Sequence, residues 1–271
     1  WCSAVLMDGR CSMVSSAKLV MVFTPFSDKN RHIWIEFHFV TVALIAICVL
    51  IFVWQVILEG DGAARFVYGF GMIPVVVTGD QTLPPELFMV PSELTLVSSL
   101  FLHGGFMHLF GNMLFLWVFG DNVEDAMGHR RFVFFYLLCG VMASLVHVWS
   151  DPSSAVPTVG ASGAISGVLG AYFVLHPKAR VWVLVLSVVP LKLPTYAIIG
   201  GWAGFQLLNA VYAEPGMTDV AWWAHIGGFI TGAALIAFFK QEHVPMWDTS
   251  GDARWQISGL TLPSQRRERQ K

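Results

Sequence analysis

The chain has 271 residues, of which 55% are hydrophobic and only 13% are charged, and its mean hydropathy is +0.63. A soluble domain has a larger share of polar and charged residues, because it needs them to cover its surface. The composition therefore predicts a multi-pass membrane protein in a lipid bilayer. The net charge of −2 gives no reason to expect a nucleic-acid partner.

The N-terminal stretch carries no motif to which a function can be assigned. Residues 1–20 begin with Trp1 and lack a long apolar core before a cleavage site, so we expect no signal peptide and treat them as sequence that need not be native. We interpret residues 1–36 as a cytoplasmic segment. The chain's four cysteines form no disulfide framework and no metal-binding spacing, and we expect neither a metal ion nor another cofactor.

Long apolar runs predict an all-α polytopic fold with six transmembrane helices, because about 20 apolar residues are needed to cross a bilayer core. In chain order the predicted helices are residues 37–58, 94–120, 132–149, 160–175, 196–212 and 221–239. Gly and Pro interrupt residues 59–93, which we expect to form a long loop at the membrane surface. Residues 181–189 are apolar but too short to span, and we expect an interfacial segment there. The membrane domain is then 37–240, followed by a polar cytoplasmic tail at 241–271.

The positions of the basic residues predict the orientation of these helices, because cytoplasmic loops accumulate Lys and Arg. Basic residues precede the first helix, follow the second, the fourth and the sixth, and are nearly absent from the other connections: Lys29, Arg31, Arg130, Arg131, Lys178, Arg180 and Lys240. Six spans with both termini cytoplasmic satisfy this rule.

With this topology, polar side chains on three different helices lie at one depth near the outer face. His108 and Asn112 are on the second helix, Ser162 begins the fourth, and His225 begins the sixth. Polar side chains are costly within a membrane, so a cluster at one level indicates a functional site.

The residue types in this cluster suit acyl transfer. Ser162 is the candidate nucleophile, and His225 is the candidate base, because the pKa of His suits proton removal near neutrality. No acidic residue is placed as a third member, which predicts a Ser–His dyad. His108 and Asn112 are four residues apart, on one helix face, and with the N–H of Ser162 they could form an oxyanion hole.

Glycines at helical spacing predict close packing of the fourth and sixth helices. Gly228 and Gly232 form a small-xxx-small pair, and Gly163 and Gly167 are available opposite them. His103 is five residues from His108, so it faces elsewhere and is interpreted as structural. Glu124 is most simply a partner for Arg130 or Arg131, close to it in the sequence.

Three motifs resemble the rhomboid family of intramembrane serine proteases over roughly residues 37–240. They are Gly-Ala-Ser-Gly at 160–163, Ala-His-Ile-Gly-Gly-Phe-Ile-Thr-Gly at 224–232, and the set His103, His108 and Asn112. The resemblance implies that Ser162 is the nucleophile and His225 the base, and that His108 and Asn112 assist the oxyanion. Some members have an aromatic residue one turn after the nucleophile to pack on the catalytic His, but this chain has Ser166 there. The sequence therefore does not identify what orients His225.

The predicted function is an intramembrane serine endopeptidase that cleaves transmembrane segments of other membrane proteins through an acyl-enzyme. By this interpretation it lies in a bacterial or archaeal plasma membrane, with its site toward the outer face. One alternative is a catalytically inactive rhomboid-like protein that binds membrane helices. Another is a small transporter, which would be expected to show internal repeats that we do not find. The sequence does not predict an oligomeric state.

Overall fold

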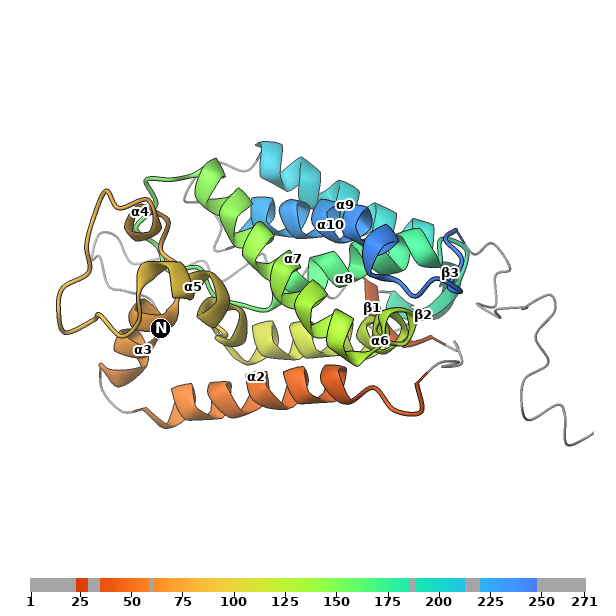
Figure 1. The fold of residues 1–271 in the computed structure, drawn as a ribbon, viewed down its shortest axis with the longest axis horizontal. Coiled ribbons are helices and arrows are strands. Elements are labelled where there is room, and N and C mark those ends of the chain that lie inside the picture. The colour runs from red at the N-terminus through yellow and green to blue at the C-terminus, as the bar shows by residue number, and fades with distance from the viewer. Residues whose placement is uncertain (1–22, 29–34, 59–60, 186–188, 213–219, 248–271) are drawn as a thin grey trace, which may run out of the picture.

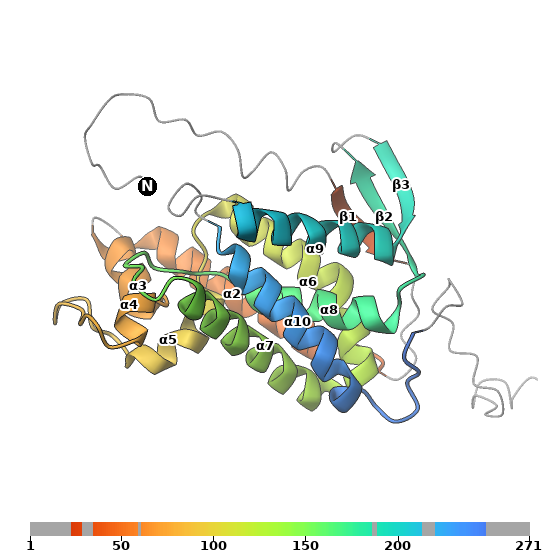
Figure 2. The ribbon, with the colours of Figure 1, turned by 90° about the horizontal axis from the view of Figure 1, so that it is seen from above.

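The computed structural model describes residues 23–28, 35–58, 61–185, 189–212 and 220–247. Long helices lie side by side in a bundle, with short helices gathered at one end and a small sheet at the other (Figures 1 and 2). The long helices are α2 (Phe39–Ile57), α6 (Phe106–Met127), α7 (His129–Ser150), α8 (Ser162–Leu175), α9 (Thr195–Tyr212) and α10 (Trp222–Phe239). The short helices are α3 (Gly62–Phe70), α4 (Pro74–Val77), α5 (Ser92–Ser98) and the 3-10 turn η1 (Ser99–Phe101).

Helix α8 is the central element of the bundle. Twelve of its 14 residues are buried, and it packs against α6, α7, α9 and α10. A helix that is apolar on all sides is expected in such a position. Side chains on several neighbouring helices can therefore contact its first residue, Ser162.

The helix predicted at 94–120 is wrong as one continuous helix. The chain forms α5 and η1, breaks at Leu102–Gly105 and only then enters α6, so that the two helical parts are bent by 81°. The adjacent glycines, Gly104 and Gly105, explain the break, because glycine is a poor helix former. The connection between the helices predicted at 94–120 and 132–149 is also mostly helical. The helix α6 continues to Met127, and α7 begins directly after Gly128, whose φ of +79° suits a tight turn.

Glu124 belongs to this polar connection and is hydrogen-bonded inside the bundle. Its side chain is fully buried, and its carboxylate accepts hydrogen bonds from the N–H groups of Val40 (3.0 Å) and Thr41 (2.8 Å) and from Thr41 Oγ1 (2.7 Å). It also contacts His129 Nδ1. The first N–H groups of a helix have no intrahelical partner and interact favourably with a negative charge. Glu124 therefore caps the start of α2, although it lies more than 80 residues later in the sequence. The predicted pairing with Arg130 or Arg131 is wrong.

The all-α prediction overlooked a three-stranded antiparallel sheet. Strand β2 (Arg180–Val185) pairs with β1 (Phe23–Asp28) on one side and with β3 (Val189–Pro194) on the other. The segment at 181–189, which we expect to be interfacial, is strand wherever the structure describes it, and its place relative to the membrane stays a prediction. A short apolar run is equally compatible with a strand, and its periodicity alone does not separate the two.

Three of the described helices are long and apolar enough to cross a membrane: α2, α7 and α10. The bent pair of α5–η1 and α6 would make a fourth if it is counted as one span. With 14 residues, α8 is about 21 Å long, shorter than the usual bilayer core. The protein is therefore mostly helical with three to four candidate spans, and the count of six with both termini cytoplasmic stays a prediction.

Candidate active site at the start of helix α8

Ser162 is the first residue of α8 and follows Gly160, which has a φ of +130°. Few side chains tolerate this backbone conformation, and a Cβ at Gly160 would also lie 2.7 Å from Cε1 and Nε2 of the His108 ring. The N–H of Gly160 donates to Ser99 O at 2.9 Å, which ties this turn to η1. Glycine at this position thus allows the imidazole of His108 to lie directly beside the turn that presents Ser162.

His225, near the start of α10, contacts Ser162. Its Nε2 lies 2.9 Å from Ser162 Oγ, so the two side chains share a hydrogen bond. Close packing of α8 and α10 makes this possible. A Cβ at Gly228 would overlap the carbonyl oxygen of Gly163, and one at Gly232 would overlap that of Gly167.

The four predicted packing glycines have different neighbours. Gly228 and Gly232 place the backbone of α10 against α8, whereas the space left by the absent Cβ of Gly163 and Gly167 is occupied from α7. At Gly163 a Cβ would lie 2.7 Å from Ala143 Cβ, and at Gly167 it would lie 2.5 Å from Cys139 Cβ. Helix α8 is therefore packed closely on both sides.

His108 and Asn112, one turn apart on α6, border the same turn. The N–H of Gly104 donates to His108 Nδ1 at 3.4 Å, so a neutral ring carries its proton on Nε2, which is the nitrogen beside Gly160. Asn112 is 8% exposed, and its Nδ2 has no hydrogen-bond partner among the described residues. A Cβ on Gly160 would lie 3.7 Å from this Nδ2. Two N–H donors therefore lie next to the turn that precedes Ser162.

A third side chain, which the sequence reasoning missed, contacts His225 from α9. Gln206 Oε1 lies 2.7 Å from His225 Nδ1, and Gln206 is only 5% exposed. The predicted Ser–His dyad is thus extended by a neutral amide, that of Gln206, which is hydrogen-bonded to His225. A signal was available, because Gln206 is a strongly polar residue within the mostly apolar helix α9, and such residues are costly in a membrane.

The hydroxyl of Ser166 is not hydrogen-bonded to the imidazole of His225. Its Oγ donates back to Ser162 O at 2.6 Å, one turn earlier on α8. Aromatic rings approach His225 from elsewhere instead. The ring centroid of Trp202, on α9, is 6.1 Å away, and that of Trp222 is 6.3 Å away. These aromatic neighbours of His225 thus come from α9 and α10.

His103 lies in the break before α6, and its imidazole centroid is 5.3 Å from that of His108. Its backbone is held by the side chain of Gln55, which donates to His103 O at 3.2 Å and accepts from His103 N at 3.1 Å. A structural role for His103 fits this geometry and stays a prediction.

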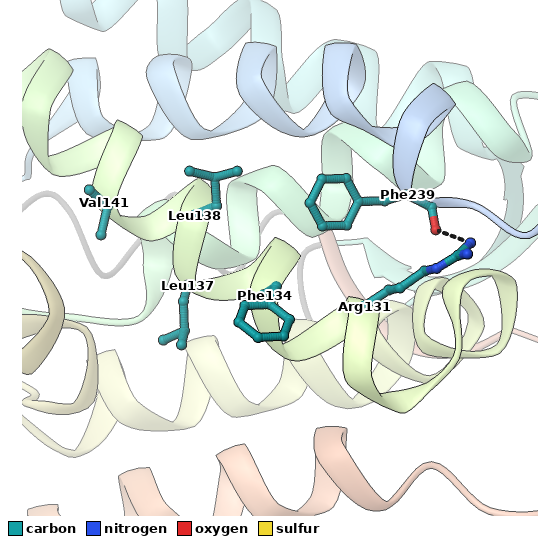
Figure 3. Close-up of a pocket in the computed structure, with 6 residues that line it drawn as sticks. All are labelled: Arg131, Phe134, Leu137, Leu138, Val141 and Phe239. Atoms are coloured by element: carbon teal, nitrogen blue, oxygen red, sulfur yellow. Dashed lines mark hydrogen bonds between the residues drawn. The ribbon is translucent and has the colours of Figure 1, made fainter.

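An open apolar groove of about 590 Å³ lies apart from this cluster (Figure 3). It is lined by Arg131, Phe134, Leu137, Leu138, Val141 and Phe239. Phe239 is the last residue of α10, whereas His225 is near its first, so the groove lies toward the opposite end of that helix. Within the described ranges, no group of three or more His, Cys, Asp or Glu residues is placed to hold a metal ion.

Comparison with known proteins gives several relatives of similar sequence. The chain is 32% identical over 152 residues to Rhomboid protein 1, mitochondrial, of Saccharomyces cerevisiae, covering 53% of this chain and 41% of that protein. It is 31% identical over 156 residues to Rhomboid-like protein 11, chloroplastic, of Arabidopsis thaliana, covering 54% and 52%. It is 28% identical over 152 residues to Presenilin-associated rhomboid-like protein A, mitochondrial, of Danio rerio, covering 54% and 37%. The chain thus spans about half or less of each relative.

These relatives correct the expected location. Two of the three are mitochondrial and one is chloroplastic by name, which points to organellar membranes. The expectation of a bacterial or archaeal plasma membrane is therefore wrong. The motifs of the site could not predict the location, because they depend on the chemistry of the site and not on the membrane in which the protein lies.

The family model of the rhomboid domain matches residues 91–242, which is more than half of the chain. The match extends from the start of α5 to just beyond the end of α10, and so includes His108, Asn112, Ser162, Gln206 and His225. The chain belongs to the rhomboid family.

Proposed function

We propose that this protein is an intramembrane serine endopeptidase that hydrolyses peptide bonds in or near transmembrane segments of other membrane proteins. The observation that carries the proposal is the 2.9 Å contact between Ser162 Oγ and His225 Nε2 at the start of a buried helix. A serine among packing glycines is usually structural, but a serine bonded to a histidine beside free N–H donors has the parts that acyl transfer requires.

The reaction begins when Ser162 Oγ attacks the carbonyl carbon of the scissile peptide bond and its proton passes to Nε2 of His225. The oxyanion that forms is stabilised by N–H donors beside Gly160, namely His108 Nε2, Asn112 Nδ2 and the backbone N–H of Ser162. Collapse of this intermediate expels the amine, which takes the proton from His225 and leaves an acyl-enzyme on Ser162. Water, deprotonated by His225, then attacks the acyl carbon, the bond to Ser162 Oγ breaks, and His225 returns the proton to Oγ as the second product leaves. No cofactor takes part.

The proposed substrates are transmembrane proteins whose helices unwind locally, because helical hydrogen bonds otherwise shield the peptide bonds. The proposed architecture is a domain at 37–240 that crosses the membrane six times, between a segment at 1–36 and a tail at 241–271. Both termini lie on the side where Lys and Arg accumulate, and the site opens toward the opposite face. The names of the relatives support an organellar membrane.

Cleavage by the purified protein tests the proposal. Wild type, Ser162→Ala and His225→Ala are reconstituted in liposomes with a model transmembrane substrate, and the products are identified by mass spectrometry. We expect cleavage by wild type and a loss of about 10⁴-fold or more in both variants, as for a nucleophile and a base that act as a unit. Cleavage that persists in Ser162→Ala refutes the assignment. Binding of several substrates by wild type without cleavage would favour the inactive helix-binding alternative.

A further inference from the structure

Three side chains from three helices form a continuous hydrogen-bonded chain. Gln206 on α9 reaches His225 on α10, with Oε1 2.7 Å from Nδ1, and His225 reaches Ser162 on α8, with Nε2 2.9 Å from Oγ. Gln206 is 5% exposed, in a part of α9 whose neighbours Leu207 and Leu208 are exposed and apolar. An amide buried in such surroundings is costly unless it is hydrogen-bonded, and His225 provides the partner.

The chemistry of the amide decides which nitrogen of His225 carries the proton. A carbonyl oxygen can only accept a hydrogen bond, so Nδ1 of His225 must donate to Gln206. A neutral imidazole has one N–H group, which leaves Nε2 with a lone pair directed at the hydroxyl of Ser162. This is the tautomer that a base needs. The opposite tautomer would donate to Ser162 and could not accept its proton.

Among the described residues, no other side chain is hydrogen-bonded to Nδ1 of His225. The hydroxyl of Ser166 donates to Ser162 O and not to His225, and the indole rings of Trp202 and Trp222 have an N–H donor but no acceptor. These rings can restrict the tilt of the imidazole without selecting its tautomer. The selection is left to Gln206.

We propose that Gln206 is a positioning residue that holds His225 in the tautomer and orientation needed to deprotonate Ser162. The inference rests on the proposed function and adds to it a neutral third member. Unlike a carboxylate, the amide orients the imidazole without adding a negative charge to the low-dielectric interior of the bundle.

Three substitutions on α9 test the role of Gln206. Gln206→Met keeps the length of the side chain and removes the acceptor, whereas Gln206→Glu retains an oxygen at the same place. Asn209→Leu is the matched control, because Asn209 is a polar residue three positions along α9 whose Nδ2 donates within the helix, to Phe205 O at 2.8 Å. Each variant is assayed in liposomes for kcat and KM on the transmembrane substrate and for thermal stability.

We expect Gln206→Met to lower kcat by about 10- to 100-fold with KM within about twofold of wild type, because only the fraction of His225 in the productive tautomer reacts. Gln206→Glu should recover most of this loss, and Asn209→Leu should retain nearly all activity. The inference is overturned if Gln206→Met retains the wild-type kcat. It is also overturned if Asn209→Leu loses as much activity, or if the loss follows thermal stability and is not recovered in Gln206→Glu.

Nitrogen-15 NMR of histidine-labelled protein reads the tautomer without any need for activity. The His225 signals are identified by their absence in His225→Ala. Wild type should show a protonated Nδ1 and an unprotonated Nε2, and Gln206→Met should show a mixture of tautomers. If wild type is inactive but these signals behave as expected, the proposed function fails while the role of Gln206 in selecting the tautomer stands. An unprotonated Nδ1 in wild type overturns the inference whatever the activity is.

Discussion

The buried polar groups near the two ends of helix α6 differ in their hydrogen bonding. Near its start, Asn112 is almost fully buried, and its Nδ2 has no hydrogen-bond partner among the residues described. Near its end, Glu124 is fully buried, and both of its carboxylate oxygens accept hydrogen bonds. A buried donor left unpaired costs stability, whereas a buried carboxylate with several donors is held firmly.

This difference separates a polar group that holds the fold together from one that is available to a ligand. Glu124 joins α6 to the start of α2, and its hydrogen bonds are complete within the protein. The Nδ2 group of Asn112 lies beside Gly160 and close to Ser162, where an oxyanion would complete its hydrogen bonding. Substitutions at the two ends should therefore have opposite consequences for activity and for stability.

Asn112→Leu is expected to give the largest effect, and it acts on catalysis. Loss of one donor to the oxyanion should lower kcat by about 10²- to 10³-fold, equivalent to roughly 3–4 kcal/mol. The free energy of unfolding should stay unchanged or rise by up to about 1 kcal/mol, because the donor that is removed had no partner among the described residues. Proteoliposome kinetics and unfolding in mixed detergent micelles measure the two quantities. Lower stability with unchanged kcat would contradict this account.

Glu124→Gln should have a smaller effect, of the opposite kind. Replacing one carboxylate oxygen by an NH₂ group sets a donor against the N–H donors of Val40 or Thr41 and removes the negative charge at the start of α2. We expect the free energy of unfolding to fall by about 2 kcal/mol. The kcat of the folded protein should stay within about threefold of wild type. A large drop in kcat at full stability would show that this end also acts in catalysis.

Thr41→Val should have the smallest effect. It removes the hydrogen bond from Thr41 Oγ1 to Glu124 and keeps the shape of the side chain and the bond from the backbone N–H. The expected loss of unfolding free energy is about 1 kcal/mol, with no change in kcat. Combined with Glu124→Gln in a double-mutant cycle, the two losses should be less than additive, since both remove the same interaction. If the two losses of unfolding free energy were fully additive, Thr41 would stabilise the fold through an interaction other than its hydrogen bond to Glu124.

Those parts of the fold that depend on local pattern could be predicted from the sequence. The apolar runs at 37–58, 196–212 and 221–239 agree with α2, α9 and α10 to within two residues at each end. Hydropathy alone overlooked the break before α6, because the flanking residues are apolar and only Gly104 and Gly105 indicate it. The sheet was overlooked for another reason. Strand β2 pairs with a segment more than 150 residues earlier, and no local pattern records that pairing.

In the candidate site the same limit applies. Ser162 and His225 stand out because each lies in a glycine-rich motif at the start of a predicted helix. Gln206 lies in a mostly apolar helix and Glu124 in a polar stretch, and their partners, His225 and Thr41, are brought to them only by helix packing. Sequence patterns therefore suggest the proposed Ser–His pair, whereas the contacts of Gln206 and Glu124 are seen only in the folded structure.

The most direct test of the central claim is covalent labelling of the nucleophile. Wild-type protein in liposomes is treated with a fluorophosphonate, which phosphonylates an activated serine hydroxyl, and the labelled peptide is identified by mass spectrometry. We expect a single label on Ser162, no label in Ser162→Ala, and labelling of Asn112→Leu and Glu124→Gln at the same residue. A label on a different serine, or none on Ser162 in well-folded wild type, would contradict this claim.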